Sequence, residues 1–194
     1  DDGLIFNQEI SKIGKIRQDT GYEGVNIKIE VFLGKSKNML HLDIGYGDKI
    51  VSGPVLLDFP VILDQFSSPN IQVYSKETAI AEKLEAIVKL SVANSRMKDF
   101  FDILFLSQNH TFQLDILYKA IKTTFNHRKT SFAAINTIFE PGFKKNASFQ
   151  ELCEGFISRN KIETISKFSE MMERLEVFLR KIPYYKDDEK EISW

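Results

Sequence analysis

Apolar and polar residues alternate in the first part of the chain, the pattern of a strand with one buried face. In residues 25–31, VNIKIEV, every second residue is Val or Ile and the residues between them are polar. After the turn sequence GKSKN, residues 39–44 alternate again, with Leu and Ile on one face and Met39, His41 and Asp43 on the other. The two segments predict an antiparallel β-hairpin.

The hydrophobic period changes after Tyr74. A short strand is expected at Ile71–Tyr74, and from Ser75 onward apolar residues recur every three or four positions, which indicates helices. Ser75 is expected to cap the first helix, with Glu77 in its first turn. Residues 94–106 predict a second helix. Further helices are predicted near Leu114–Phe125, Ala133–Phe139, Phe149–Ser158 and Ile162–Lys181, followed by an exposed tail.

This order of elements predicts an α+β fold, with a β-rich part in residues 1–74 and an all-helical domain in residues 75–194. A chain of 194 residues can bury a sizeable core without external staples. Cys153 is the only cysteine, which excludes an internal disulfide and a cysteine-based zinc site and is compatible with a reducing cytosol. Without a signal peptide pattern or an apolar run of about 20 residues, a cytoplasmic protein that does not enter the membrane is expected.

Charged residues interrupt the predicted second helix. Residues 94–106, NSRMKDFFDILFL, place Arg96, Lys98, Asp99 and Asp102 among Met, Phe, Ile and Leu side chains that face more than one side. Arg96 and Asp99 are three residues apart and Lys98 and Asp102 four, so both pairs can meet on the helix surface. A buried charge is costly unless it is paired or faces a polar cavity. The cluster therefore predicts either a cleft lining or an ion-pair network that only ties the helix to its neighbours.

Three blocks of the sequence carry a family resemblance. Residues 74–103 contain E-x-x-x-A-E-K-x-x-A followed by S-R-x-K-D-x-x-D, residues 41–48 read HLDIGYGD, and the chain opens with DDGLIF. Together they resemble the AbiEii/AbiGii-type abortive-infection toxin family of nucleotidyltransferases over most of residues 1–106. The resemblance implies that residues 1–74 form the C-terminal part of a polymerase-β-like nucleotidyltransferase core, with a mixed or antiparallel sheet, and that a helical domain follows.

The resemblance also implies a metal site. Enzymes of this kind bind two Mg²⁺ ions with an Asp-x-Asp pair and a third Asp on a nearby strand, and an upstream Gly-Ser turn holds the nucleotide phosphates. Asp43 matches the third Asp, as a catalytic residue that binds metal or helps to deprotonate the acceptor. No Gly-Ser followed by Asp-x-Asp occurs in the 194 residues. We therefore expect an amino-terminal catalytic half that precedes this chain, with a degenerate homologue as the alternative, and an inactive isolated chain.

The family's lysine and charged helix motif match residues of the helical part. The resemblance implies that Lys83 reaches the triphosphate as a mobile charge. Asp99 and Asp102 are expected to hold Lys83 and Arg96 in place or to face the nucleotide cleft. The substrate-binding set implied in this way is Lys83, Arg96, Lys98, Asp99 and Asp102.

Three functions are compatible with these patterns. The first is transfer of a nucleotide from a nucleoside triphosphate to an RNA, such as tRNA, or to a protein acceptor, by the toxin of a toxin–antitoxin pair that defends against phage. The second is a non-catalytic recognition module that docks a cognate antitoxin or an acceptor through its helices and a basic patch at Lys119–Lys129, although such a patch is also typical of a solvated helix face. A metal-dependent hydrolase using Asp43, Asp48, Asp99 and Asp102 would lack histidine ligands and a recognisable spacing.

Overall fold

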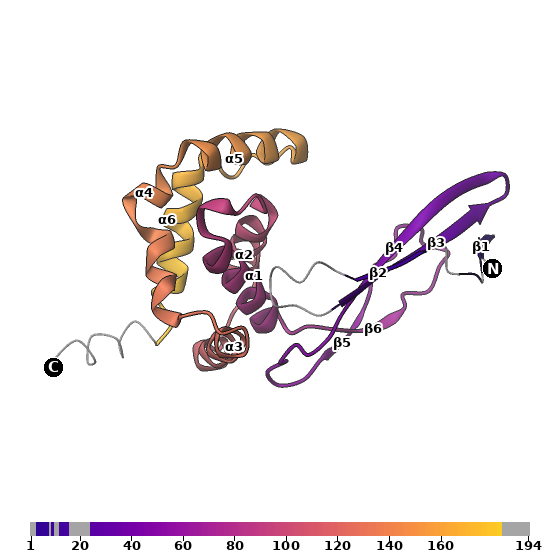
Figure 1. The fold of residues 1–194 in the computed structure, drawn as a ribbon, viewed down its shortest axis with the longest axis horizontal. Coiled ribbons are helices and arrows are strands. Elements are labelled where there is room, and N and C mark those ends of the chain that lie inside the picture. The colour runs from indigo at the N-terminus through magenta and orange to yellow at the C-terminus, as the bar shows by residue number, and fades with distance from the viewer. Residues whose placement is uncertain (1–2, 8, 10–11, 16–23, 184–194) are drawn as a thin grey trace. The chain divides into compact units, whose positions relative to one another are not determined.

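Two compact units, Asp1–Asp48 and Lys49–Trp194, make up the fold. The computed structural model describes residues 3–7, 9, 12–15 and 24–183 of the chain. Figure 1 shows strands in the first part of the chain and helices in the rest. The predicted α+β fold with a helical C-terminal part is confirmed.

The first unit is an antiparallel sheet built around one long strand. Its strands are β1 (Leu4–Phe6), β2 (Lys12–Lys15), β3 (Gly24–Leu33) and β4 (Ser36–Gly45). β4 pairs with β3 along its whole length, and β1 and β2 pair with the two ends of β3 on its other edge. β3 and β4 are the two segments whose alternation predicted a hairpin, and that prediction is confirmed.

A two-residue turn fixes the register of this hairpin. Leu33 pairs with Ser36, and Gly34 between them has a φ of 57°, which glycine adopts without steric cost. The register places Asn26 opposite Asp43 and Lys28 opposite His41, so polar side chains share one face. The other face is apolar and carries Val25, Ile27, Ile29, Leu40, Leu42 and Ile44.

The second unit begins with a short hairpin and continues as helices. β5 (Val55–Asp58) and β6 (Asn70–Val73) pair antiparallel. The helices are α1 (Lys76–Leu90), η2 (Ser91–Ala93), α2 (Met97–Asn109), α3 (Leu114–His127), η3 (Phe132–Phe139), α4 (Pro141–Lys144), α5 (Ala147–Asn160) and α6 (Phe168–Leu179). The change to helices at residue 75 agrees with the sequence pattern, whereas the compact units divide at Asp48 and Lys49, so the β5–β6 hairpin belongs to the same unit as the helices.

Local side-chain contacts fix the ends of the helices. The Ser75 hydroxyl accepts a hydrogen bond from the Thr78 backbone N–H at 3.2 Å, the N-cap that the sequence predicts for α1. Asn146 caps α5 in the same way through the Phe149 N–H. At the other end of α5, Lys161 adopts the left-handed conformation, which stops the helix.

The core of the second unit is formed by buried side chains from α1, α2, α3, η3, α4, α5 and α6. Four phenylalanine rings at its centre come from α2, α4, α5 and α6: Phe100, Phe143, Phe149 and Phe168. Their ring centroids are 5.5 Å apart for Phe100 and Phe168, and 4.8 Å apart for Phe143 and Phe149. Such tilted contacts add roughly 0.5–1.5 kcal/mol per pair to the burial of the rings.

Electrostatic contacts tie α6 to α4 and to its own last turn. Glu176 of α6 accepts a hydrogen bond from the Lys144 ammonium of α4 and another from Arg180. Burial alone would raise the pKa of Glu176, but these hydrogen bonds and the two positive charges outweigh it and lower the pKa below its usual value.

Two predicted helices differ from the structure, and three strands, β1, β2 and β5, were not predicted. Residues 132–139 form a 3₁₀ helix, η3, where an ordinary helix was expected. The helix predicted at Ile162–Lys181 starts only at Phe168, because Lys161 ends α5 in a left-handed turn and a loop follows it. β5 was not predicted, because Val55–Leu57 is a continuous apolar run without alternation. The predicted exposed tail, residues 184–194, lies outside the described residues.

Replacing Phe100 with alanine is expected to reduce the free energy of unfolding by about 3–5 kcal/mol, because the ring is fully buried and its loss leaves a cavity. Urea unfolding followed by circular dichroism measures the change. Phe105→Ala on the same helix is the matched control, since that ring is 52% exposed, and it should cost less than about 1 kcal/mol. Equal losses in the two variants would contradict this assignment of the core.

Candidate functional site

Lys83 of α1 meets both carboxylates of the charged helix. Its ammonium Nζ lies 3.3 Å from Asp99 Oδ1 and 2.7 Å from Asp102 Oδ2, both on α2. The helices α1 and α2 pack against each other, so this lysine crosses the contact between them. Two of the residues that the sequence motif grouped with Lys83 are thus in direct contact with it.

Asp99 is the buried member of the cluster. Its side chain is only 3% exposed, compared with 26% for Asp102. Arg96 Nε lies 2.8 Å from Asp99 Oδ2, but the two are not aligned as a hydrogen bond, and among the described residues this oxygen accepts none. A buried carboxylate oxygen without a hydrogen bond is costly unless neighbouring positive charge compensates it. Asp99 therefore depends on Lys83 and Arg96.

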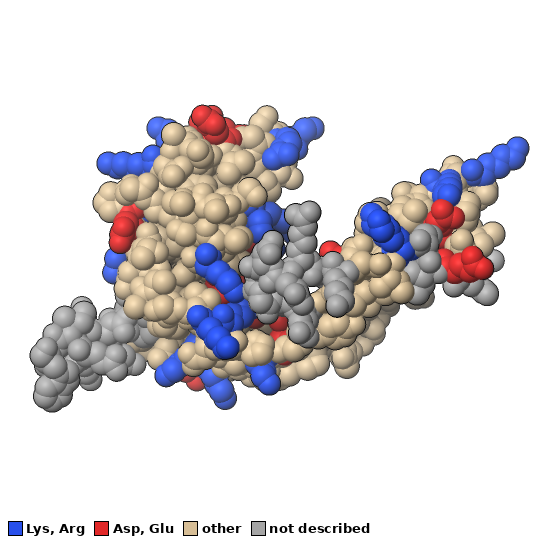
Figure 2. Space-filling model, viewed as in Figure 1, with Lys and Arg blue, Asp and Glu red and all other residues tan. Residues whose placement is uncertain are grey.

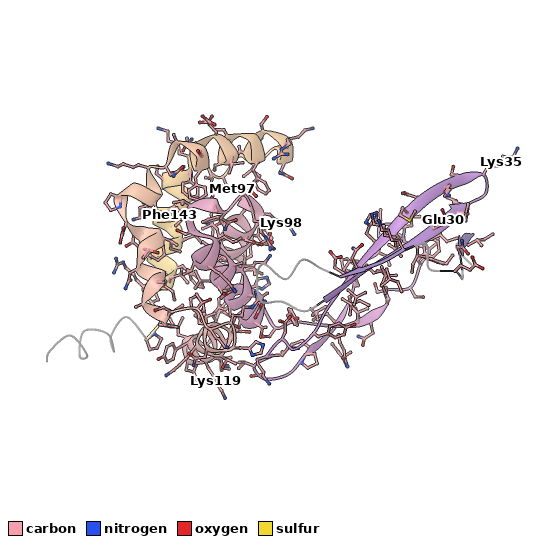
Figure 3. The ribbon with its side chains drawn as sticks, in the orientation of Figure 1. Glu30, Lys35, Met97, Lys98, Lys119 and Phe143 are labelled. Atoms are coloured by element: carbon pink, nitrogen blue, oxygen red, sulfur yellow. The ribbon has the colours of Figure 1, made fainter. Side chains whose placement is uncertain are left out.

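The loop before α2 positions Arg96. Buried Asn94 accepts a hydrogen bond from the Arg96 backbone N–H at its side-chain oxygen, at a distance of 2.7 Å. This contact fixes the backbone of Arg96 at the start of α2, and the Arg96 side chain contacts Asp99. Lys98 follows on the surface, with its ammonium 3.6 Å from Asp102 Oδ2. Figure 3 labels Lys98 and its neighbour Met97 at the start of the helix.

A pocket of about 310 Å³ opens beside this cluster. Its lining includes Lys83, Ser95, Arg96, Met97, Lys98 and Asp99 from α1, α2 and the loop before α2, and Leu152, Phe156 and Arg159 from α5. Lys83, Arg96, Lys98 and Asp99 line the pocket and also form ion pairs, whereas Asp102 pairs with Lys83 and Lys98 without lining the pocket. Figure 2 shows Lys and Arg side chains gathered in several groups on this unit.

Arg159 is the residue of this pocket that sequence reasoning missed. It lies more than 50 positions after the charged helix motif, in a segment where no resemblance was found. Its spacing from Phe156 and Leu152, three and seven residues, places the three on one face of α5. Only this helical spacing could have grouped them, and it gives no indication of which neighbouring helix they would face.

A second ion-pair network lies on another side of α1. Arg128, directly after α3, pairs with Glu82 and Glu85 of α1, the latter at 3.2 Å between Nη1 and Oε2. The Glu85 side chain is fully buried and also accepts a hydrogen bond from the Thr130 hydroxyl. Thr124 of α3 donates to Glu82 at 3.0 Å. The adjacent Glu82 and Lys83 thus hold α1 to different helices.

This ion-pair network removes Arg128 from the predicted basic patch at Lys119–Lys129. Arg128 is directed into the contact between α1 and α3, so it does not belong to the exposed surface. Lys119, Lys122 and Lys129 remain exposed, and Figure 3 labels Lys119 on α3. A surface for partner binding would therefore have to use these lysines without Arg128.

Asp43 lies in the other unit, on the exposed strand β4. Its Oδ1 accepts a hydrogen bond of 2.5 Å from Asn26 Nδ2, the residue directly opposite on β3. His41 is two residues away on the same face, beside Lys28. The position on the polar face of the strand agrees with the sequence pattern.

Metal ligands are sparse in the described part of the chain. Within residues 3–7, 9, 12–15 and 24–183, no group of three or more His, Cys, Asp or Glu side chains could hold a metal ion. Asp43 offers one carboxylate, and a pair of Mg²⁺ ions requires several oxygen ligands. The residues described here therefore do not by themselves form a site for two Mg²⁺ ions.

Comparison with known proteins decides the family. A family model described as nucleotidyl transferase AbiEii toxin, type IV toxin–antitoxin system, matches residues 1–188. The chain belongs to this family. The AbiEii resemblance of the sequence motifs is thereby confirmed. None of the described helices combines the length and the apolar composition that crossing a membrane requires.

Two solved structures from Helicobacter pylori are similar to this chain. JHP933 is 18% identical to this chain, with a TM-score of 0.44, and the match covers 100% of this chain and 72% of JHP933. A candidate nucleotidyltransferase from the same organism is 17% identical, also with a TM-score of 0.44, over 97% of this chain and 70% of its own. No curated protein matches the chain.

We expect Asp99→Asn to reduce the free energy of unfolding by about 2 kcal/mol, because it leaves Lys83 and Arg96 without their buried counter-charge. Asp102→Asn, at the partly exposed end of the same network, should cost less than about 1 kcal/mol. Denaturant unfolding of both variants tests the difference. Equal costs would mean that burial does not distinguish the two carboxylates.

Removing Arg128 should be more damaging than removing any exposed lysine of α3. Arg128→Ala leaves the fully buried Glu85 without its cationic partner, which is expected to cost about 3–5 kcal/mol. Lys119→Ala removes the same charge from the surface and should change stability by less than about 0.5 kcal/mol. Thermal unfolding monitored by calorimetry compares the two, and an unaffected Arg128→Ala variant would refute the structural role.

Proposed function

We propose that this AbiEii-family chain takes part in transferring a nucleotide from a nucleoside triphosphate to an RNA or protein acceptor. The observation that carries the proposal is the basic pocket beside Lys83, because polyphosphate is the part of the substrate that such a pocket recognises. The family match to nucleotidyl transferase toxins supports the same chemistry. We further propose that the acceptor is an RNA, such as tRNA, or a protein.

In the proposed reaction an acceptor hydroxyl oxygen attacks the α-phosphorus of the triphosphate. A bond forms between these atoms, the bond from the α-phosphorus to the bridging oxygen of the β-phosphate breaks, and pyrophosphate leaves with the electron pair. Lys83, Arg96 and Lys98 bind the β- and γ-phosphates and neutralise the charge that grows on pyrophosphate. Asp99 and Asp102 position Lys83, since both carboxylates contact its ammonium.

Asp43 serves in this proposal as a metal ligand or as the base that takes the acceptor proton. Its carboxylate is exposed on β4 and has one hydrogen-bond donor, Asn26. When bound, Mg²⁺ would neutralise phosphate charge. The described residues supply too few ligands for two ions, so Asp43 alone would hold only part of such a site.

The biological setting proposed for this activity is a cytoplasmic toxin that is paired with a cognate antitoxin and acts in phage defence. The family description names a type IV toxin–antitoxin system, which supports such a pairing. As a second candidate function, the chain would be a non-catalytic module that binds an antitoxin or acceptor. The exposed lysines 119, 122 and 129 favour that alternative.

Nucleotidyl transfer is tested with the complete gene product, including any residues encoded before Asp1. The protein is incubated with Mg²⁺, each labelled nucleoside triphosphate and a total extract of RNA and protein. Transfer of label is expected, and Asp43→Asn should reduce it roughly 100-fold or more, because a metal ligand or base is lost.

Asp58→Asn provides a matched control for Asp43→Asn. Asp58 is also an exposed strand residue whose Oδ1 accepts a hydrogen bond from the Asn directly opposite, Asn70, at 2.9 Å. This variant should transfer label at the parental rate. Transfer that survives Asp43→Asn would remove Asp43 from the reaction, and the absence of transfer to any acceptor would favour the recognition module.

A further inference from the structure

Arg159 has no role in the ion-pair networks that join the described residues of its unit. On α5 its side chain is exposed, and its Nε donates to the Gly155 carbonyl of its own helix at 3.1 Å. Among the described residues, no carboxylate lies within ion-pair distance of its guanidinium. An arginine that lines a pocket without a counter-charge is available to bind an anion.

The other cations of the pocket already form ion pairs with the nearby carboxylates. Lys83 contacts both Asp99 and Asp102. Arg96 shares Asp99 with it, and Lys98 shares Asp102 with it. Among the described residues, the lining thus contains four cations, with Arg159 included, and one carboxylate, Asp99, while Asp102 pairs with two of the cations from outside the lining. These groups carry an excess of two positive charges, which favours a ligand with several negative charges.

The position of Arg159 is set by the packing of α5. Phe156, one turn earlier on the same face, packs on Phe101 of α2 with ring centroids 5.6 Å apart. Leu152, one turn before that, also lines the pocket. These contacts fix the backbone of α5 beside α2, so the flexible Arg159 side chain extends from a fixed position in the pocket lining.

We propose that Arg159 binds the terminal phosphate groups of a polyphosphate in this pocket, together with Lys83, Arg96 and Lys98. The planar guanidinium offers two parallel N–H donors to phosphate oxygens, which a lysine ammonium does not. That the polyphosphate is the tail of a nucleoside triphosphate rests on the proposed function. Recognition of the phosphate groups themselves needs neither transfer nor an acceptor.

Binding of inorganic tripolyphosphate to the complete 194-residue chain, measured by isothermal titration calorimetry at low salt, tests this inference. Arg159→Ala is expected to weaken binding roughly tenfold, which corresponds to about 1.4 kcal/mol. Arg159→Lys keeps the charge but loses the paired donors, so it should restore only part of the affinity. Lys119→Ala removes one exposed charge outside the pocket and should change the affinity less than about twofold.

The result that would overturn the inference is a parent chain that does not bind tripolyphosphate, or Arg159→Ala and Lys119→Ala variants with equal affinities. Circular dichroism melting of each variant establishes that it is folded. A parallel titration with nucleoside triphosphates shows whether the pocket binds nucleotides as well as inorganic tripolyphosphate. If tripolyphosphate binds through Arg159 and the nucleotides do not, the inference holds while the proposed nucleotide substrate fails.

Discussion

Burial of charge on α1 is the constraint on which the helical unit depends. The helix carries Glu82, Lys83 and Glu85 among side chains that form the core, and Glu85 is fully buried. A charge in that environment costs several kcal/mol unless a partner of opposite sign is held beside it, and removing one partner costs about 3–5 kcal/mol. The partners come from other helices, so α1 can keep its charges only when α2 and α3 are correctly packed.

The two networks on α1 differ in what their surroundings allow. Arg128, Thr124 and Thr130 satisfy the two glutamates in a closed arrangement at the contact with α3. On the other side, Lys83 and its carboxylates lie at the edge of a pocket that α5 completes. The first network therefore has a structural role alone, whereas the second holds positively charged side chains in place beside a space that a ligand can enter.

In the first unit, the alternation of polar and apolar residues along the strands decides the arrangement of side chains. Alternation along β3 and β4 separates a polar face, with Asn26, Lys28, His41 and Asp43, from an apolar one. The apolar Leu40, Leu42 and Ile44 are each more than a third exposed, so the sheet is thinly covered in this structure. Asp43 stands on the polar face and accepts a hydrogen bond from Asn26, directly opposite on β3.

Local patterns decided much of this structure. Period-two alternation specified β3, β4 and their pairing, and the cap at Ser75 with its helical spacing specified α1. The spacing within residues 94–106 also specified the pairs Arg96–Asp99 and Lys98–Asp102, because residues three and four apart on a helix are neighbours. The family motif added Lys83 to this group, and the structure places it in contact with both carboxylates.

Contacts between distant residues were decided by the tertiary structure alone. The sequence placed Arg128 in an exposed basic patch, but the fold turns it toward Glu82 and Glu85, more than 40 positions earlier. Arg159 joined the pocket because Phe156 packs α5 against α2, a contact that no local period encodes. Hydrophobic periodicity tells which face of a helix is buried, whereas the identity of the helix that covers this face depends on how all the helices pack together. The sequence by itself thus determined β3, β4, β6, most of the helices and the charged motif, and only the packed fold determined which charges of different helices form ion pairs.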